Sequence, residues 1–380
     1  MNIVVNKKKF LDAYNFVKIA IDQKAKLNDY YSTGLKAINV FTDGDTIKLS
    51  ATGKNIETSA TLDCIKINEH GSVSIYYEVL DKTTQLYLDS ELSIRSENNE
   101  VIIKCGKESG QYSQYDIENY DNDESVHHPE DWITIPKEMF FIACDRVSFA
   151  TCKDKNGIRS KMSSVFFKMT NNTLDLVASD GHMLTKLTIP YEHPIPDFSF
   201  LLDVNILLRI FKGIKQIISE SIDISITKEL LFIKDNNLEV NCTLIDSSYI
   251  NYDKLIATKK NIHFSICFKR KDLLRKLNTY KFDKGIVGFK FPRKGIMEIL
   301  NVHEKIDQLS ITTEKKPVDK GYLINVALKN LTLILKHLTY DTLCIDFCDP
   351  TEIFFIRDTS KNNHITLIQP SVLNTNKWKR

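Results

Sequence analysis

Hydrophobic residues follow two different periods along the chain. One face of a helix is indicated near the start by the apolar series Phe10, Tyr14, Val17 and Ile21. Other stretches alternate every second residue and are rich in β-branched side chains, as strands are; examples are residues 72–76, 101–103 and 222–226. The pattern predicts an α+β fold whose helices cover residues 7–26, 78–90, 137–153, 203–219, 269–283 and 325–338.

The chain also repeats itself. The segment Ile47–Gly53 recurs as Leu174–Asp180 at an interval of 127 residues, a third of the 380-residue chain. A second landmark, Tyr120, is echoed by Tyr252 at an interval of 132 residues. A third, fainter copy has helical patterns at 271–280 and 327–338 and a closing strand at 365–368. Three repeated domains are therefore expected.

Two polar stretches mark the domain boundaries. Residues 121–131 have the composition of a linker, and residues 257–260 form a second break. We expect domains at 1–124, 125–256 and 257–380, each with two helices against antiparallel sheets. The 42% hydrophobic content is enough for several cores.

Charge is distributed unevenly, although the net charge is only +2. The six predicted helices hold 21 basic and 10 acidic residues, so the rest of the chain is acidic. Such a helical layer favours a phosphate backbone. The alternative, that these lysines only solvate exposed helix faces, remains open. The helix at 78–90, with Glu78, Asp81 and Asp89, does not fit a basic layer.

Several classes of protein are not indicated. The chain shows no secretion signal and no membrane span, and its eight cysteines are scattered without a CxxC pair, so we expect a cytoplasmic protein with reduced thiols. Phosphate-loop, dinucleotide and nucleophile-elbow motifs are missing from the sequence, so neither an enzyme nor a cofactor is expected.

One segment resembles a known family. Residues Ala178–Leu184, ASDGHML, are similar to the ATDGHRL segment of the bacterial DNA sliding clamp, the beta subunit of DNA polymerase III. The resemblance spans the whole chain, and its other parts are Phe149–Thr151 leading into Arg159, Leu244–Tyr252, Trp132 and Leu367–Pro370.

The resemblance implies a clamp fold that forms half of a closed ring. Two chains would make a homodimer that encircles double-stranded DNA without reading its sequence, with an edge strand at 112–115 in the dimer contact. The implied partners are the replicative polymerase catalytic subunit, an ATP-dependent clamp loader and other clamp-motif proteins of repair and replication control. The DNA-binding residues would be Lys24, Lys26, Asn156, Arg209, Lys212, Lys215, Lys271, Arg275, Lys329 and Lys336.

The family also binds short partner peptides in a groove between its second and third domains. Carried over, the peptide-binding residues are Arg159, Met162, Ser179, Gly181, His182, Met183, Leu184, Ile250, Lys254, Leu255, Leu367, Gln369 and Pro370. Met183, Ile250 and Gln369 depart from the usual family residues, which predicts a different peptide preference. Residues 374–380 extend past the usual end, either as a frayed tail or as a flap over the groove.

Two further functions were weighed. A clamp-like scaffold would present the peptide groove without encircling DNA. A hydrolase would use Ser179 and His182, although triad residues are normally distant in sequence. His127 and His128, near Glu124 and Asp131, lack metal-specific spacing, so no metal site is predicted.

Overall fold

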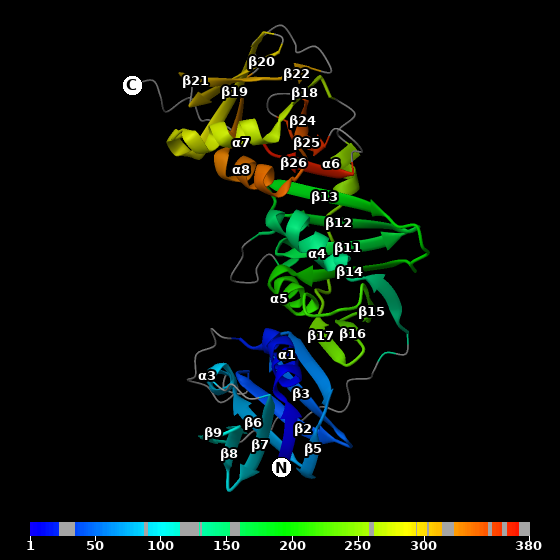
Figure 1. Ribbon diagram of the computed structural model, residues 1–380. Coiled ribbons are helices and arrows are strands. Elements are labelled where there is room, and N and C mark those ends of the chain that lie inside the picture. The colour runs from blue at the N-terminus through cyan, green and yellow to red at the C-terminus, as the bar shows by residue number, and fades with distance from the viewer. Residues whose placement is uncertain are drawn as a thin grey trace. The chain divides into compact units, whose positions relative to one another are not determined.

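A strand, a helix and three further strands recur in this order along the chain (Figure 1). The computed structural model describes residues 1–22, 35–86, 90–114, 129, 131–152, 160–257, 262–293, 295–301, 304–313, 323–348, 352–358 and 363–371. Six copies of the unit are found there, two in each predicted domain. The α+β fold with repeated domains is thus confirmed. The sequence revealed the threefold repeat but not the doubling within each domain.

The first predicted domain holds two copies. The first copy comprises β1 (Asn2–Asn6), α1 (Lys7–Val17), β2 (Ala37–Asp43), β3 (Thr46–Gly53) and β4 (Ile56–Asp63), followed by the short β5 (Lys66–Glu69). The second comprises β6 (Ser72–Tyr76), α3 (Tyr77–Leu86), β7 (Glu91–Glu97), β8 (Glu100–Cys105) and β9 (Glu108–Ser113).

The central copies follow the same order. One comprises β10 (Ile133–Pro136), α4 (Glu138–Ile142), β11 (Ser164–Thr170), β12 (Thr173–Ser179) and β13 (Met183–Pro190). The other comprises β14 (Phe198–Asp203), α5 (Val204–Ile214), β15 (Ser221–Ile226), β16 (Leu230–Asp235) and β17 (Leu238–Thr243). The helix expected at 137–153 is interrupted, because α4 is followed by a π-helical turn (Ala143–Val147) and a 3-10 turn (Ser148–Ala150).

The last two copies begin after a short helix, α6 (Tyr252–Ala257), which the sequence did not predict. One copy comprises β18 (Phe264–Lys269), α7 (Arg270–Thr279), β19 (Ile286–Arg293), β20 (Ile296–Asn301) and β21 (Glu304–Ser310), followed by β22 (Thr312–Thr313). The other comprises β23 (Leu323–Ala327), α8 (Leu328–His337), β24 (Thr342–Phe347), β25 (Phe354–Asp358) and β26 (His364–Ile368).

Strand pairing interlocks the two copies within a domain. The first strand of each copy joins the three strands of the other copy: β1 pairs with β7, and β6 pairs with β2. The last strands then join neighbouring domains, because β4 pairs with β17 and β13 pairs with β26, all antiparallel. The result is an eight-stranded sheet and a nine-stranded sheet that each continue across a predicted domain boundary.

These continuous sheets explain how the chain divides into compact units. One unit contains residues 1–141 and 205–246, and the other contains 142–204 and 247–380. The division falls inside the predicted central domain, because each of its sheets is shared with a different neighbour. The predicted domain boundaries themselves remain a prediction, and most of the polar stretches 121–131 and 257–260 lies outside the described residues.

Helix α1 shows why the helices end earlier than the sequence suggests. The Asn6 side chain caps its start by accepting a hydrogen bond from Lys9 N at 3.0 Å. Its apolar face is buried, including Phe10, Tyr14 and Val17. The helix expected to reach residue 26 ends in a 3-10 turn at Ala20 and becomes extended at Ile21. The buried hydroxyl of Thr58 donates to Val17 O at 2.8 Å, so a strand satisfies a carbonyl at the helix end.

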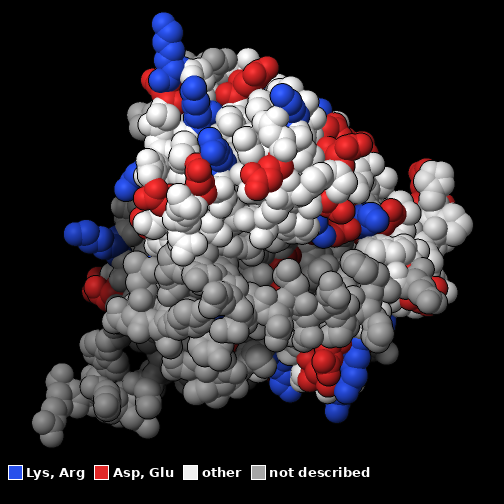
Figure 2. Space-filling view, turned by 90° about the horizontal axis from the view of Figure 1, so that it is seen from below, with Lys and Arg blue, Asp and Glu red and all other residues white. Residues whose placement is uncertain are grey.

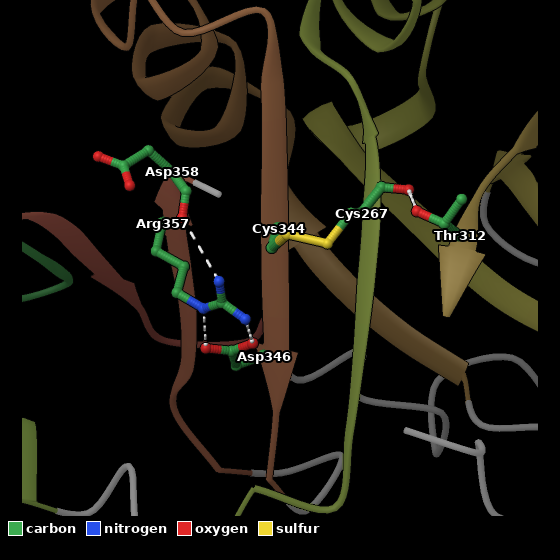
Figure 3. The surroundings of a disulfide bond; sticks show 6 residues. All are labelled: Cys267, Thr312, Cys344, Asp346, Arg357 and Asp358. Carbon is green, nitrogen blue, oxygen red and sulfur yellow. Dashed lines mark hydrogen bonds and ion pairs between the residues drawn. A yellow bond between two sulfur atoms is a disulfide. The ribbon is translucent and has the colours of Figure 1, made fainter. Parts of the chain in front are cut away.

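The cysteines do not all remain thiols as expected. Cys267 and Cys344 form a disulfide between the adjacent strands β18 and β24 (Figure 3). The expectation of reduced thiols throughout is therefore wrong for this pair. The reason is register: the two residues are 77 positions apart in sequence but lie directly opposite each other in the sheet. Within the described residues, no helix is long and apolar enough to cross a membrane.

Candidate functional site

The turn between β12 and β13 is built by its own polar side chains. The Ser179 hydroxyl donates to Met183 O at 2.8 Å and accepts from Gly181 N at 3.1 Å. The carboxylate of Asp180 accepts from the backbone N–H groups of His182 and Met183, both at 2.8 Å. These bonds hold Gly181 at a φ of +89°, in the region that favours glycine.

This turn lies against the end of β26. Leu184 is paired with Leu367 in the sheet, and Gln369 N donates to His182 O at 3.0 Å. The third side is a short 3-10 turn (Ser160–Met162), because Met162 Sδ would lie 3.6 Å from a Cβ placed on Gly181. A Cβ at position 181 would thus be in van der Waals contact with the Met162 thioether, and the φ of +89° is what disfavours a larger residue there. Three segments far apart in sequence thus meet at one place.

Helix α6 borders the same region. Asn251 caps the helix by accepting from Lys254 N at 3.1 Å. Tyr252 is buried in an apolar cluster with Leu184 and Leu367, together with Val177, Cys348 and Phe355. Burial raises the pKa of Tyr252 above its usual value, with Asp175 contributing. Leu255 points outward with 37% of its surface exposed, while Tyr249 and Ile250 pack partly buried against the cluster.

The structure places most of the predicted peptide-binding residues in this one region. The first central copy supplies Met162, Ser179, Gly181, His182, Met183 and Leu184. Ile250 precedes α6, Lys254 and Leu255 lie in α6, Leu367 lies in β26, and Gln369 and Pro370 follow β26. Met183, Leu184 and Leu367 are buried and support the surface from beneath, whereas His182, Lys254 and Gln369 are exposed. Arg159 and the tail 374–380 lie outside the described residues.

The side chains of the alternative hydrolase site have structural roles. The Ser179 hydroxyl is 4% exposed and bonded at both ends within the turn, and the Asp180 oxygen binds backbone N–H groups rather than an imidazole. The arrangement stabilises a tight turn. His127, His128 and Glu124, weighed as metal ligands, lie outside the described residues, and the described residues hold no cluster of three or more ligand side chains.

The predicted DNA-binding residues are divided among three helices and two segments outside the described residues. Lys24, Lys26 and Asn156 are in those segments. Exposed side chains are found for Lys212 on α5, Lys215 just after it, Lys271 and Arg275 on α7, and Lys329 and Lys336 on α8. Helices α7 and α8 pack against each other, so four of these six cations belong to one helical layer (Figure 1).

Some basic residues on the helices have intramolecular partners. Arg209 is half-buried, and its Nη1 donates to Ala20 O at 3.2 Å, which links α5 to the end of the first helix. Lys18 forms an ion pair with Asp81 of α3 and lies over the Tyr14 ring. Asp81 also accepts from the Tyr14 hydroxyl at 2.7 Å. The acidic helix α3, which did not fit a basic layer, thus supplies a partner for α1.

Charge elsewhere is mixed. On the face seen in Figure 2, basic and acidic side chains lie interspersed among uncharged ones. Several lysines are paired with acids: Lys186 of β13 with Asp175 at 2.8 Å, and Lys276 of α7 with Asp307 at 2.7 Å. Unlike these, the exposed cations of α8 have no acidic residue in their own helix.

Comparison with solved structures matches the chain almost end to end. A putative DNA polymerase III beta subunit from Eubacterium rectale has a TM-score of 0.86 and 18% identity, covering 98% of this chain and 100% of that chain. The beta subunit from Thermotoga maritima has a TM-score of 0.84 and 17% identity, covering 98% and 99%. A Pseudomonas aeruginosa sliding clamp bound to griselimycin has a TM-score of 0.84 and 14% identity, covering 98% and 100%.

This chain has the sliding-clamp fold. At 14–18% identity, the likeness to these three clamps lies in the fold, and no family model and no curated protein matches the sequence. The clamp fold accounts for the six copies of the unit and for the sheets that continue from domain to domain.

Sequence reasoning missed two features of this chain. Helix α6 was missed because six residues are too short for a periodic signal, although Asn251 was a readable helix cap. The roles of Lys18 and Asp81 were missed because they are 63 residues apart. The contact of Met162 with Gly181 was suggested by the resemblance alone and had no local signal.

Proposed function

We propose that this protein is a DNA sliding clamp: a homodimeric ring that encircles duplex DNA and tethers the replicative polymerase catalytic subunit. The observation that carries the proposal is the match to sliding clamps over 98% of the chain. The protein would act as a processivity factor in the cytoplasm, without a catalytic site of its own. An ATP-dependent clamp loader would open and close the ring.

Strand pairing supports ring closure. Of the six last strands, β4 is joined to β17 and β13 to β26, which leaves β9 and β21 at the ends of their sheets in the described part of the chain. An end strand offers unpaired backbone groups to another chain. The other four last strands pair with a last strand of a neighbouring domain. By the same pairing, β9 of one protomer joins β21 of its partner. Two such contacts close a ring of two chains. The edge strand expected at 112–115 begins earlier, at Glu108.

The basic helices support a loose hold on DNA. A clamp must slide, so its contacts must be to phosphates rather than to base edges. Lysine and arginine side chains that stay exposed on α5, α7 and α8 supply screened, sequence-independent attraction of this kind. The proposed DNA-binding set also includes Lys24, Lys26, Asn156 and Arg209. Arg209 has a structural role in addition, because it donates a hydrogen bond to Ala20 O.

The region around Gly181 and α6 supports peptide binding. Gly181 has no side chain to keep a peptide backbone away, and Met162 beside it is a flexible, polarizable side chain. Leu255 adds an exposed apolar contact. The Pseudomonas aeruginosa clamp was crystallised with griselimycin, so that protein has a binding site for a ligand. We assign this region to the polymerase, the clamp loader and other clamp-motif proteins, with Arg159 nearby.

The oligomeric state tests the proposal directly. Sedimentation velocity or light scattering at micromolar concentration is expected to give twice the chain mass of 43.8 kDa. A monomer at every concentration contradicts the ring and favours a scaffold that presents the peptide region without encircling DNA.

A further inference from the structure

The disulfide joins two strands that are already paired. Cys267 of β18 and Cys344 of β24 are opposite each other in register, with their Cα atoms 4.0 Å apart (Figure 3). Cys267 is 6% exposed and Cys344 is fully buried. Two residues further along β24, Asp346 receives two hydrogen bonds from Arg357, at 2.7 and 3.0 Å. Arg357 belongs to β25, so these hydrogen bonds hold β24 to the strand on its other side, whereas β18 is held to β24 by the backbone pairing and the disulfide.

The internal repeat shows that the fold does not need this bond. Strands β1 and β18 both end where their helices begin, at Asn6 and Lys269. Counting back two residues places Val4 in the position of Cys267. The register of β1 with β7 places Ser93 opposite Val4, in the position of Cys344. The first domain thus builds the same strand pair from a valine and a serine, so the disulfide serves a purpose other than forming the sheet.

Cys267 is linked to the edge strand β21 through β22. It is paired with Thr312 of β22, whose hydroxyl donates to Cys267 O at 3.4 Å. A single residue, Ile311, separates β22 from β21. The disulfide strand therefore anchors the segment that continues the edge strand proposed for the dimer contact.

That anchor is short compared with its counterpart in the first domain. There, β5 follows β4 and pairs with β1 at three positions, Asn2 with Glu69, Ile3 with Ile67 and Val4 with Lys66. In the third domain, β22 pairs with β18 at two positions, Ile266 with Thr313 and Cys267 with Thr312. Along its length β21 is paired with β20, but its end at Ser310 is held through these two residue pairs, so the position of that end depends on how rigidly β18 is held.

We propose that the Cys267–Cys344 disulfide is a reversible redox switch that controls how firmly β21 is held, and so the stability of the dimer contact made by that strand. This inference rests on the proposed ring. Oxidised protein holds β18, β22 and β21 in place and favours the closed dimer. Reduced protein lets the end of the sheet open more often, and the dimer dissociates more readily.

The chemistry balances with a dithiol and a peroxide as co-reactants. A thiolate of the dithiol attacks Cys267 Sγ, the more exposed sulfur, and the Cys344 thiolate leaves and takes up a proton. The second thiol of the reductant then releases Cys267 as a thiol, so the protein gains two electrons and two protons while the dithiol becomes a disulfide. In the reverse direction, hydrogen peroxide oxidises one thiol to a sulfenic acid, the other thiol condenses with it, and two waters are released in total.

Linkage makes the effect reciprocal. If the disulfide strengthens dimerisation by some factor, then dimerisation favours the disulfide by the same factor. At equilibrium with a fixed ratio of reduced to oxidised dithiothreitol, the fraction of oxidised protein is therefore expected to be higher above the dimer dissociation constant than in diluted protein.

The first test compares dimer dissociation constants of the full chain by sedimentation velocity after peroxide and after dithiothreitol. Reduction is expected to weaken the dimer by about tenfold, a common size for such coupling. Cys344→Ser is expected to match reduced wild type in both conditions, and Cys64→Ser, a half-buried cysteine elsewhere, to respond like wild type. If the dimer dissociation constant is the same for oxidised and reduced protein, the redox proposal is wrong but the proposed ring stands. If the protein is monomeric in both redox states, the redox proposal and the proposed ring are both wrong.

A second measurement needs no dimer and no variant. Amide hydrogen exchange of residues 304–313 in diluted wild-type protein is expected to be at least about tenfold faster after reduction, while β19 and β23, which do not pair with β21, exchange unchanged. Equal exchange in the two states, or a failure of peroxide to form the bond as judged by mass spectrometry, overturns the switch.

Discussion

The hydroxyl of Thr185 lies 3.1 Å from Nε2 of His364, across the pairing of β13 with β26. The same hydroxyl is 3.0 Å from that of Thr366, and all three side chains are fully buried. This polar cluster lies where the second predicted domain joins the third. Because a shift of register would leave these groups without hydrogen bonds in a buried place, the cluster favours one alignment of the two strands.

The cluster predicts a pH dependence of stability. Burial, with the Arg146 charge nearby, lowers the pKa of His364 to about 4 from its usual 6.5. Below the usual value the unfolded chain binds a proton that the folded chain does not, so stability is complete above pH 6.5 and is lost as the pH falls toward 4. Between about pH 7.5 and about pH 5, this single group accounts for roughly 2 kcal/mol.

Urea denaturation at several pH values measures that contribution. His364→Asn is expected to flatten the pH dependence by this amount, and His263→Asn, at an exposed histidine, is expected to leave it unchanged. Equal pH dependence in wild type and His364→Asn contradicts the assignment.

A glycine limits the approach of the first helix to its sheet. A Cβ on Gly53 would lie 1.8 Å from Ala20 O, a backbone atom that cannot move alone. Gly53→Ala is expected to lower the free energy of unfolding by about 3 kcal/mol. Gly44→Ala is the matched control, because Gly44 has open space and a φ of +55°, and it is expected to cost about 1 kcal/mol. Thermal denaturation that ranks the two variants in the opposite order contradicts this packing.

The exposed leucines test the peptide region. Leu255 on α6 and Leu208 on α5 are similarly exposed, at 37% and 43%. Leu255→Ala is expected to weaken binding of a polymerase tail peptide by about tenfold, because a buried apolar contact is lost. Leu208→Ala is expected to leave affinity unchanged in fluorescence anisotropy. Equal affinities for the two variants place the peptide elsewhere.

The helical cations test how DNA is held. Replacing Lys271, Arg275 and Lys329 with glutamate reverses three charges. This change is expected to reduce the amount of clamp loaded onto DNA and to make loading less dependent on salt concentration, since three phosphate contacts are lost. Reversing Lys66, Lys104 and Lys290, exposed lysines on strands, changes the net charge equally and is expected to have a much smaller effect. A quantitative loading assay at two salt concentrations compares the sets, and equal losses contradict the helical assignment.

The sequence predicted the fold where local pattern and repeat agree. The segment at 72–76 is β6, and the two segments that revealed the repeat became the equivalent strands β3 and β12. Helix ends were extended too far because their termini are decided by distant partners. The first helix ends near Val17, where the hydroxyl of Thr58, 41 residues away in sequence, donates a hydrogen bond to the Val17 carbonyl.

The same distinction between local and distant partners decides which parts of the candidate sites could be predicted from the sequence. The turn at Ser179–Met183 was readable because its hydrogen bonds are local. The disulfide was not, since Cys267 and Cys344 meet only through the register of two strands that are separated in sequence by α7, α8 and a whole sheet. Lys18 was counted with the basic helices although Asp81 neutralises it, because the pairing of α1 with α3 is a tertiary contact.

Retention on closed circular DNA tests topological binding most directly. The dimer, loaded by its clamp loader onto a nicked circle, is expected to stay bound through gel filtration at a salt concentration that disrupts phosphate contacts. Cutting the circle with a restriction enzyme is expected to release it, because the ring slides off the ends. Equal retention on circular and linear DNA contradicts encirclement.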